Sequence, residues 1–512
     1  MTDIIHRCLL VHELLVEVAQ NLAADADKLH MAQACRAFYE VAMDELWRSP
    51  GNVLLKLISC FPPDAIHVVR GYYMGCDDIK ILRPPTPSEW GRFKLYAKRV
   101  RVLGLFSAPL SIDGPARLMR WLDVLARAFP DTPVFPNLRQ LHMGPDFVEY
   151  VHLFLQPNLT EFHLARYTTE AVQTVVPCLQ RACAPTIRNL SFCQTGPISR
   201  IVREMDALTK AYEDFMKSCR SLVRLETSIP FRLSTLAKLA ALPSLEQLII
   251  HTPFLEELDD AEPMPEHIHL PALVSLDLHS TVEDILRYLR AASMPAIRNM
   301  ALGTNWVNVP AFVSPAPGVP LVSTHELAEI ISHLPKFPSL QRIHIFPPLA
   351  HPAALLRAST LTPLTSLPNL VIVDIYRFHF DLRPADVMAM ARAWPALQCL
   401  CLGAYGQDAP PDPPKICVED LYPFAQHCPA LATLEMLVAG SSALARRTQP
   451  FAPEERVVHM RLKTFSVGPS LIRDVDDQLR AARFVRAVFP RAQLVAEDPK
   501  TAQNLWAALV HG

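Results

Sequence analysis

The stretch LPSLEQLII at residues 242–250 decides the fold of this chain, because close variants of it recur along the sequence. The variants are FPNLRQLHM (135–143), LPALVSLDL (270–278), FPSLQRIHI (337–345), WPALQCLCL (394–402) and CPALATLEM (428–436). Each has proline second and apolar residues fourth, seventh and ninth. This recurrence predicts a protein built from stacked structural repeats.

The repeat has an apolar residue at position 0 and further apolar residues at +3 and +5. It occurs 13 times, and ten copies carry proline at −2. Positions +3 and +5 share one face of an extended strand, because strand side chains alternate. Position 0 is occupied by Val100, Leu138, Leu159, Ile187, Leu222, Leu245, Leu273, Ile297, Leu340, Leu370, Leu397, Leu431 and Leu462.

Helical stretches precede most copies, for example at 212–219, 234–242, 282–294, 326–334 and 385–394. The proline that follows most of these stretches cannot continue a helix and favours extended backbone before it. One such unit buries too little apolar surface to fold alone, so neighbouring units must stack their strands into a shared sheet. The sequence therefore predicts an α/β solenoid with a curved parallel sheet and helices on its convex side.

The repeat resembles the leucine-rich repeat, whose units read LxxLxLxxN/C. Only Asn305, eight residues after Ile297, fits the final N/C position, so we expect irregular loops after the strands.

Composition narrows the possible function. The net charge is −2, which gives no overall attraction to nucleic acid or to anionic membranes. The chain has only 15 glycines and no GxxxxGK[ST] or GxGxxG motif, so a phosphate-binding loop is not expected. The 12 cysteines form no CxxC pair, and no run of 18 apolar residues occurs. We expect a cytoplasmic or nuclear protein that binds neither nucleic acid nor membrane.

The first 50 residues do not join the repeat. The stretch LLVHELLVEVAQNL has apolar residues at positions 14, 15, 18 and 22, which is helical spacing. Farther on, Met31, Cys35, Phe38, Ala42 and Leu46 predict one amphipathic helix that ends at Leu46–Trp47. Two or three helices in these 40 residues make only a small core, so a partner or the first repeats should complete it.

This segment resembles the F-box motif, roughly LPxELLxxIxxxL followed by LxxxxxVCRxWxxxxxxxxLW. Val11 replaces the usual proline, and Phe38 replaces a frequent tryptophan. The stretch at 88–105 is similar to the entry segment of fungal F-box proteins with degenerate leucine-rich repeats. The resemblance implies a Skp-type adaptor, and through it a cullin–RING ubiquitin ligase, as partner. The residues that would face or support the adaptor are Leu10, Leu14, Leu15, Val18, Leu22, Leu29 and Trp47.

The predicted domains are an F-box-like module at 1–50, a linker and entry segment at 51–90, and the solenoid at 91–512. Repeat positions +2, +4 and +6 point away from the core and form the concave face, where solenoids commonly bind ligands. The candidate binding residues there are His142, His163, Arg224, Glu226, Asp277, His279, Arg342, His344, Asp374 and Tyr376.

Catalysis is not expected from these residues. His142, His163 and Glu161 could in principle meet on neighbouring strands and hold a metal, but polar residues on an open sheet are usually solvated. The sequence has no GxSxG motif. We expect no enzyme activity, no metal and no cofactor. The function indicated is a substrate receptor of a Skp–cullin–F-box ligase, holding an unidentified protein substrate. The alternative is a repeat scaffold or inhibitor whose F-box-like segment only caps the solenoid.

Overall fold

The computed structural model of the chain describes residues 11–49, 53–69, 78–106, 114–130, 132–193, 205–229, 233–240, 242–251, 267–303, 323–346, 355–376, 378–403, 414–440, 457–467, 472 and 475–495. The chain divides into two compact units, Met1–Ile229 and Pro230–Gly512. The predicted boundaries at residues 50 and 90 remain predictions.

The first unit begins with three short helices: α1 (His12–Asn21), α2 (Asp25–Ala34) and α3 (Arg36–Arg48). Leu15 and Ala19 of α1 pack against Val41 of α3 to form one small core. Ala32, Ala42 and Met43 form a second cluster, against which Trp47 is packed. We call these helices the helical module. Its cores are small, as expected for so short a segment.

The prediction of a single helix through Met31 and Leu46 is wrong. Cys35 is extended, with φ −162° and ψ 165°, and separates α2 from α3. In one continuous helix Ala32 and Ala42 would lie about 15 Å apart along the axis. In the structure they belong to the same buried cluster. Folding α2 back on α3 buries both, and this gain outweighs the helical spacing across Cys35.

A short entry region leads from the module to the sheet of the first unit. It contains α4 (Val53–Ile58), the antiparallel pair β1 (Ile66–Val69) and β2 (Asp78–Ile81), and α5 (Trp90–Ala97). Phe61, Trp90 and Phe93 pack with Trp121 and Phe129 in one aromatic cluster. This cluster buries the end of the repeat array beneath the entry region.

The sheet of the first unit is parallel. In spatial order its described strands are β3 (Val102–Leu105), β4 (Gln140–Met143), β5 (Glu161–Ala165), β6 (Asn189–Cys193) and β7 (Arg224–Thr227). The segments between them form α6 (Gly114–Ala128), η2 (Pro145–Leu153), α7 (Thr169–Ala182) and α8 (Met205–Ser218), where η marks a 3-10 helix.

The second unit continues the same plan. Its main sheet is parallel, in the order β8 (Gln247–Ile250), β10 (Ser275–His279), β12 (Asn299–Gly303), β13 (Arg342–Phe346), β15 (Ile372–Tyr376), β17 (Cys399–Gly403), β18 (Thr433–Met436), β19 (Thr464–Ser466) and β20 (Gln493–Val495). Two short parallel pairs lie outside it, β9 (Ile268–His269) with β11 (Ala292–Ser293) and β14 (Leu355–Arg357) with β16 (His379–Asp381).

Helices and 3-10 turns fill the connections of the second unit. They are α9 (Leu233–Leu239), α10 (Val282–Ala291), α11 (Thr324–His333), η5 (Leu334–Lys336), η6 (Ala358–Thr360), η7 (Thr362–Ser366), α12 (Pro384–Ala393), η8 (Val418–Leu421), α13 (Tyr422–His427) and α14 (Val475–Val488). Side-chain caps begin some of them: Thr281 accepts a hydrogen bond from Asp284, and Ser323 forms a capping box with Glu326.

All 13 predicted repeats supply a strand, and each strand begins two residues after position 0. In the repeat at 242–250, Leu245, Leu248 and Ile250 are each at most 1% exposed. The backbone N–H groups of Val274 and Ser275 both donate to the carbonyl of Glu246, at position +1 of the preceding repeat. This pair of bonds recurs between neighbouring repeats and fixes their register, so Leu248 lies beside Leu276.

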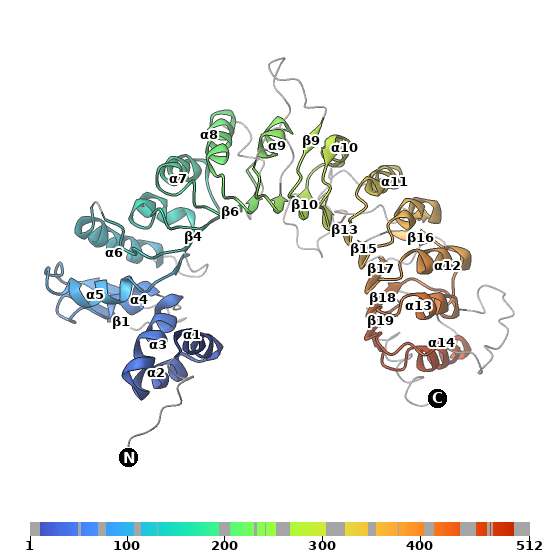
Figure 1. Cartoon of the computed structure of the whole chain (residues 1–512), viewed down its shortest axis with the longest axis horizontal. Coiled ribbons are helices and arrows are strands. Elements are labelled where there is room, and N and C mark those ends of the chain that lie inside the picture. Colours follow the sequence, from blue (N-terminus) through green and yellow to red (C-terminus); the bar gives the residue numbers. More distant parts are fainter. Residues whose placement is uncertain are drawn as a thin grey trace. The chain divides into compact units, whose positions relative to one another are not determined.

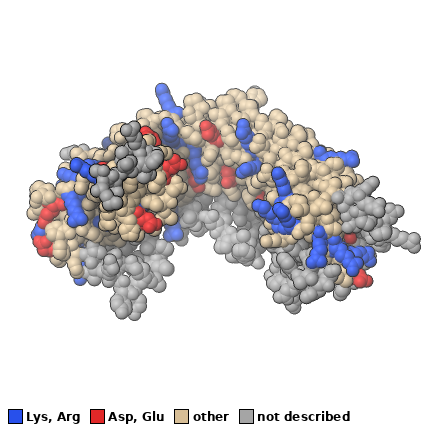
Figure 2. All heavy atoms as spheres, turned by 60° about the horizontal axis from the view of Figure 1, so that its bottom comes forward, with Lys and Arg blue, Asp and Glu red and all other residues tan. Residues whose placement is uncertain are grey.

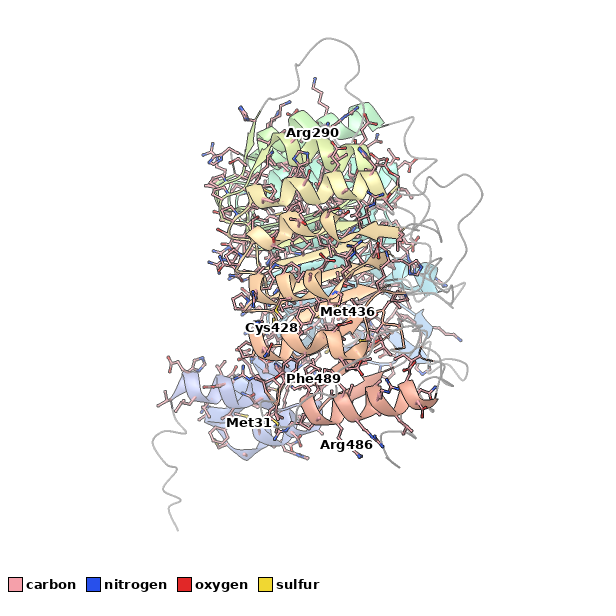
Figure 3. The ribbon with its side chains drawn as sticks, turned by 90° about the vertical axis from the view of Figure 1, so that its right-hand side faces the viewer. Met31, Arg290, Cys428, Met436, Arg486 and Phe489 are labelled. Atoms are coloured by element: carbon pink, nitrogen blue, oxygen red, sulfur yellow. The ribbon has the colours of Figure 1, made fainter. Side chains whose placement is uncertain are left out.

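The strand β20 was not predicted. Its repeat carries Arg491 at position 0, and Pro490 lies one residue too late for the pattern. Backbone pairing nevertheless continues, because the N–H of Gln493 donates to the carbonyl of Lys463. In these last repeats Cys428, Met436 and Phe489 are buried (Figure 3).

In each unit the helices lie on one face of the parallel sheet (Figure 1). Helices need about 10 Å of width, whereas neighbouring strands are about 4.8 Å apart, so the helix-bearing face of each sheet is the longer, convex one. The predicted fold class, an α/β leucine-rich-repeat solenoid after a small all-α module, is confirmed. Asn305 lies outside the described residues. Within the described part of the chain, no helix is long and apolar enough to cross a membrane.

Candidate functional site

Helix α1 presents an exposed row of apolar side chains. Val11, Leu14 and Val18 are 43%, 44% and 47% exposed. Their spacing of three and four residues puts them on one side of the helix, which we call the apolar stripe. The neighbouring side of α1 carries Leu15 and Ala19, which are buried in the module. The stripe is therefore left over after the module has formed its own core.

The structure separates the residues that the F-box resemblance assigned to an adaptor. Leu14, Val18 and Leu29 are exposed, and Leu22 is half-buried at the C-terminal end of α1. Leu15 is 4% exposed, and Trp47 is half-buried against the second cluster of the module, so these two support the fold of the surface. Leu10 lies outside the described residues.

The helical module is tied to the entry region by charge and by aromatic packing. The guanidinium of Arg99, only 7% exposed, donates to Glu40 at 2.5 Å and also to Asp44. The hydrogen bond and the charge of Arg99 lower the pKa of Glu40. Trp47 stacks on Tyr96 of α5. These contacts are made by residues of α3, whereas the apolar stripe belongs to α1.

The open face of each sheet, opposite the helices, carries the predicted candidates at +2 and +4. In the first unit they form a hydrogen-bonded network across β4–β7. His142 lies 3.5 Å from Glu161, and the ring centroids of His142 and His163 are 5.6 Å apart. At the other end, Arg224 donates to Glu226 at 3.1 Å. Each of these side chains is half-buried. The open face of the first unit therefore presents both hydrogen-bond donors and acceptors that solvent or a ligand can reach.

One pair in this network has the distance of a base and a nucleophile. Nδ1 of His163 lies 2.7 Å from Oγ of Ser191. Burial, followed by the charge of His142, lowers the pKa of His163. The adjacent thiol of Cys193 donates to Glu226, and burial raises its pKa to about 12. The neighbouring backbone N–H groups are used in the pairing of β5 with β6, so they are not free to stabilise an oxyanion at Ser191.

The second unit carries two histidine–carboxylate pairs on its open face. His279 lies 2.8 Å from Asp277 on the same strand, and His344 lies 3.1 Å from Asp374 on the neighbouring strand. Arg342 is exposed at the start of β13. The side chain of Tyr376 lies outside the described residues.

The thiols of Cys399 and Cys401 are 3.7 Å apart on β17. The hydrogen bond with Cys399, together with burial, raises the pKa of Cys401, so its thiol is protonated and a poor metal ligand at neutral pH. Among the described residues, no group of three or more His, Cys, Asp or Glu side chains is arranged to hold a metal ion.

On the face shown in Figure 2, basic and acidic side chains of the described residues are interspersed. Neither sign covers a broad area in this view, and most of the visible described surface is uncharged.

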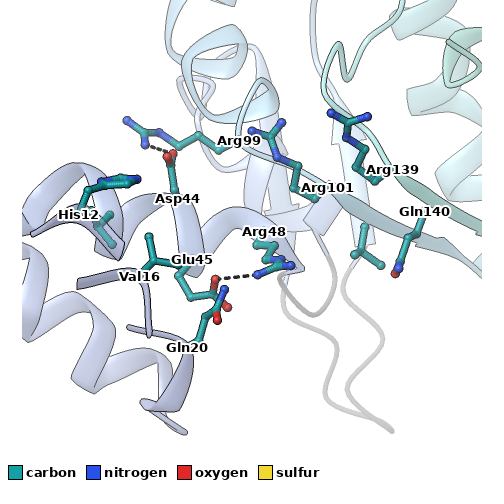
Figure 4. A pocket seen from close by; sticks show the side chains of 12 residues that line it. His12, Val16, Gln20, Asp44, Glu45, Arg48, Arg99, Arg101, Arg139 and Gln140 are labelled. Atoms are coloured by element: carbon teal, nitrogen blue, oxygen red, sulfur yellow. Dashed lines mark hydrogen bonds and ion pairs between the residues drawn. The ribbon is translucent and has the colours of Figure 1, made fainter. Parts of the chain in front are cut away.

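Sequence reasoning missed a cavity in the first unit. It lies between α1 and α3 of the helical module and the strands β3 and β4, and its lining includes Arg48, Arg101 and Arg139 (Figure 4). The sequence signal that could have indicated it is the arginine at +1 in two neighbouring repeats, Arg101 and Arg139. The approach of Arg48 could not be read from the sequence, because it depends on how α3 meets the first strand.

No protein-family model and no curated protein matches this chain. Among solved structures, the complex of Rad7 and Elc1 in yeast matches with a TM-score of 0.32 and 14% identity, covering 66% of this chain and 77% of that chain. A protein from Bacteroides fragilis matches with a TM-score of 0.25 and 13% identity, covering 49% of this chain and 67% of that chain. At these TM-scores neither likeness bears on fold or function.

Proposed function

We propose that this protein is a substrate receptor of a Skp–cullin–F-box ubiquitin ligase. The helical module binds a Skp-type adaptor, and the open face of the repeats holds a protein substrate. The protein does no chemistry itself. It raises the effective concentration of substrate lysines near the ubiquitin-conjugating enzyme.

The observation that carries this proposal is the apolar stripe on α1. About half of Leu14 and half of Val18 remain exposed although the module has a core nearby. Covering each of them would contribute about 1 kcal/mol. Leu14, Val18 and the similarly exposed Leu29 are residues that the F-box resemblance assigns to the adaptor. A contiguous exposed apolar surface typically marks a protein interface.

The open face supports the second half of the proposal. Several of its candidates are held by one another, as His344 is by Asp374 and Arg224 is by Glu226. Preorganised polar groups lose little conformational freedom on binding. The backbone N–H groups beside Ser191 are already paired within the sheet, which favours recognition over catalysis there.

The test is co-purification of the full chain with a purified Skp-type adaptor. We expect a complex that Leu14→Asp weakens roughly 100-fold, because the interface would have to bury a charge in place of an apolar group. The matched control is Leu95→Asp. Leu95 is 42% exposed, close to the 44% of Leu14, but belongs to α5 outside the module. A native chain that forms no complex, or equal loss in both variants, would contradict the proposal.

A second candidate is favoured by the contacts of Arg99 and Trp47. They join the module firmly to the first repeats, as a cap for the end of a solenoid requires. On this reading the protein is a non-catalytic repeat scaffold or inhibitor. Deleting residues 1–50 would then destabilise the first unit, and the native chain would retrieve no adaptor. Adaptor binding by the native chain decides between the two candidates.

A further inference from the structure

Three arginines lie in a row where the helical module meets the sheet of the first unit. The N–H of Arg101 donates to the carbonyl of Arg48 at 2.9 Å, and the N–H of Arg139 donates to the carbonyl of Arg101 at 2.7 Å. The end of α3 thus occupies the place of one more strand in the hydrogen-bond ladder. The backbones that carry successive members of this arginine row are therefore about 4.8 Å apart across the ladder.

The arginine row lines a cavity of about 360 Å³. His12, Val16 and Gln20 of α1 contribute the opposite wall (Figure 4). Cavities that bind small molecules typically have volumes of about 300–1,000 Å³. The size of this cavity suits a compact ligand.

Positive charge in the cavity exceeds negative charge. Its lining holds four arginines and two carboxylates. Both carboxylates are engaged, Asp44 by Arg99 and Glu45 by Arg48 at 3.3 Å. Arg101 and Arg139 instead donate to backbone carbonyls, those of Asn137 at 3.2 Å and Asn158 at 3.1 Å.

Among the described residues, neither Arg101 nor Arg139 forms an ion pair. A guanidinium has five N–H donors, so most of theirs remain available to a ligand. Burial lowers the pKa of Arg101, and the charges of Arg139 and Arg48 lower it further against the opposing effect of Asp44. Burial and the neighbouring guanidinium groups thus disfavour the charge of Arg101, and a bound anion would offset both effects.

We propose that this cavity binds a compact anion carrying two or more phosphate groups, with Arg48, Arg101 and Arg139 donating to separate oxygens. Guanidinium groups match phosphate oxygens in geometry and in charge. The backbones at the two ends of the row are about 9.6 Å apart across the ladder, so linked phosphates let each guanidinium meet its own oxygen without all three converging on one group.

The ligand would not compete with the apolar stripe. His12, Val16 and Gln20 lie on the side of α1 roughly opposite Val11, Leu14 and Val18, at about 100° for each residue. A bound anion would fasten α1 to β3 and β4 while leaving the stripe exposed. The proposal therefore stands whether or not the module binds an adaptor.

The test is calorimetric titration of the full chain with inorganic pyrophosphate, in buffer free of phosphate and sulfate. We expect saturable one-to-one binding that the double variant Arg101→Gln/Arg139→Gln weakens at least tenfold. The control is Arg188→Gln, because Arg188 is exposed at the same repeat position, +1, but does not line the cavity. Absence of saturable binding, or equal weakening by the control, would overturn the proposal.

Two further measurements keep the result interpretable if the double variant folds poorly. Arg139→Gln alone changes an exposed side chain, and pyrophosphate should raise its Tm less than it raises that of Arg188→Gln. Inorganic phosphate should bind more weakly than pyrophosphate, and hexaglutamate should not compete with it. Equal binding of phosphate would refute the requirement for linked phosphates, and tighter binding of hexaglutamate would assign the cavity to an acidic peptide.

Discussion

The indole of Trp47 stacks on the ring of Tyr96, with centroids 4.6 Å apart and planes inclined by 18°. This contact joins α3 of the helical module to α5 of the entry region. Trp47 was predicted from the F-box resemblance to face or support an adaptor. Its stacking on Tyr96 and its packing on Ala42 and Met43 give it a supporting role in the free chain.

Trp47→Ala is therefore expected to act on stability first. We expect the free energy of unfolding of the first unit to fall by about 2–3 kcal/mol, from lost burial and the lost aromatic pair. Urea unfolding followed by far-UV circular dichroism measures this. Tyr96→Ala removes the same pair, so the two substitutions should be non-additive. Unchanged stability together with lost adaptor binding would instead make Trp47 a direct contact.

The repeat pattern makes a second prediction within a single strand. Leu248 of β8 is 0% exposed, whereas its neighbour Ile249 is half-buried on the open face. Leu248→Ala should cost about 2–5 kcal/mol because it leaves a cavity between sheet and helices. Ile249→Ala, the control in the same strand, should cost less than about 1 kcal/mol. Equal losses in urea unfolding would mean that this strand does not bury the face indicated by the repeat.

The repeats could be predicted because each is decided locally. Apolar residues at 0, +3 and +5 and the helix-stopping proline lie within nine residues, so every predicted repeat appears as a strand beginning at +2. The strand β20 was not predicted, because its repeat has Arg491 at position 0 and backbone pairing tolerates this residue. The break at Cys35 was not predicted either. It depends on the packing of α2 against α3, and helical spacing along the sequence carries no information about that packing.

The candidate sites were predictable only in part. Alternation along a strand places His142 and His163 on the open face, but the partners of each depend on strand register. Within α1, spacing alone cannot separate exposed Leu14 from buried Leu15, because the two are adjacent on the helix. The cavity needs Arg48 beside Arg101, a contact between segments more than 50 residues apart in sequence.

Gly303 provides a third prediction, on the open face of the second unit. It is the register partner of His279, and a Cβ at this position would overlap the His279 ring. Gly303→Ala should therefore push His279 away from Asp277 and reduce the free energy of unfolding by about 1–2 kcal/mol. If the overlap with the ring is the cause, Gly303→Ala should cost little further free energy of unfolding in a chain that already carries His279→Ala. An equal cost of Gly303→Ala with and without the His279 ring would instead place the cost in the backbone of β12.

The contact between Glu40 and Arg99 predicts how stability depends on pH. Arg99 lowers the pKa of Glu40 in the folded chain, so this group contributes stability above its unfolded pKa of about 4.3. The contribution disappears as the pH falls through the lower, folded pKa. Because Glu40 is largely exposed, we expect Glu40→Gln to cost no more than about 1 kcal/mol at pH 7.

The native and Glu40→Gln chains should differ less in free energy of unfolding at pH 3 than at pH 7. Urea unfolding at both pH values measures this difference. The matched control is Glu17→Gln, because Glu17 is also exposed in the module, lies in the middle of α1 and makes no ion pair among the described residues. It should leave stability unchanged at both values. A cost of Glu40→Gln that grows as the pH falls would contradict a lowered pKa of Glu40. The ion pair with Arg99 would then not stabilise the contact between the module and the first repeat.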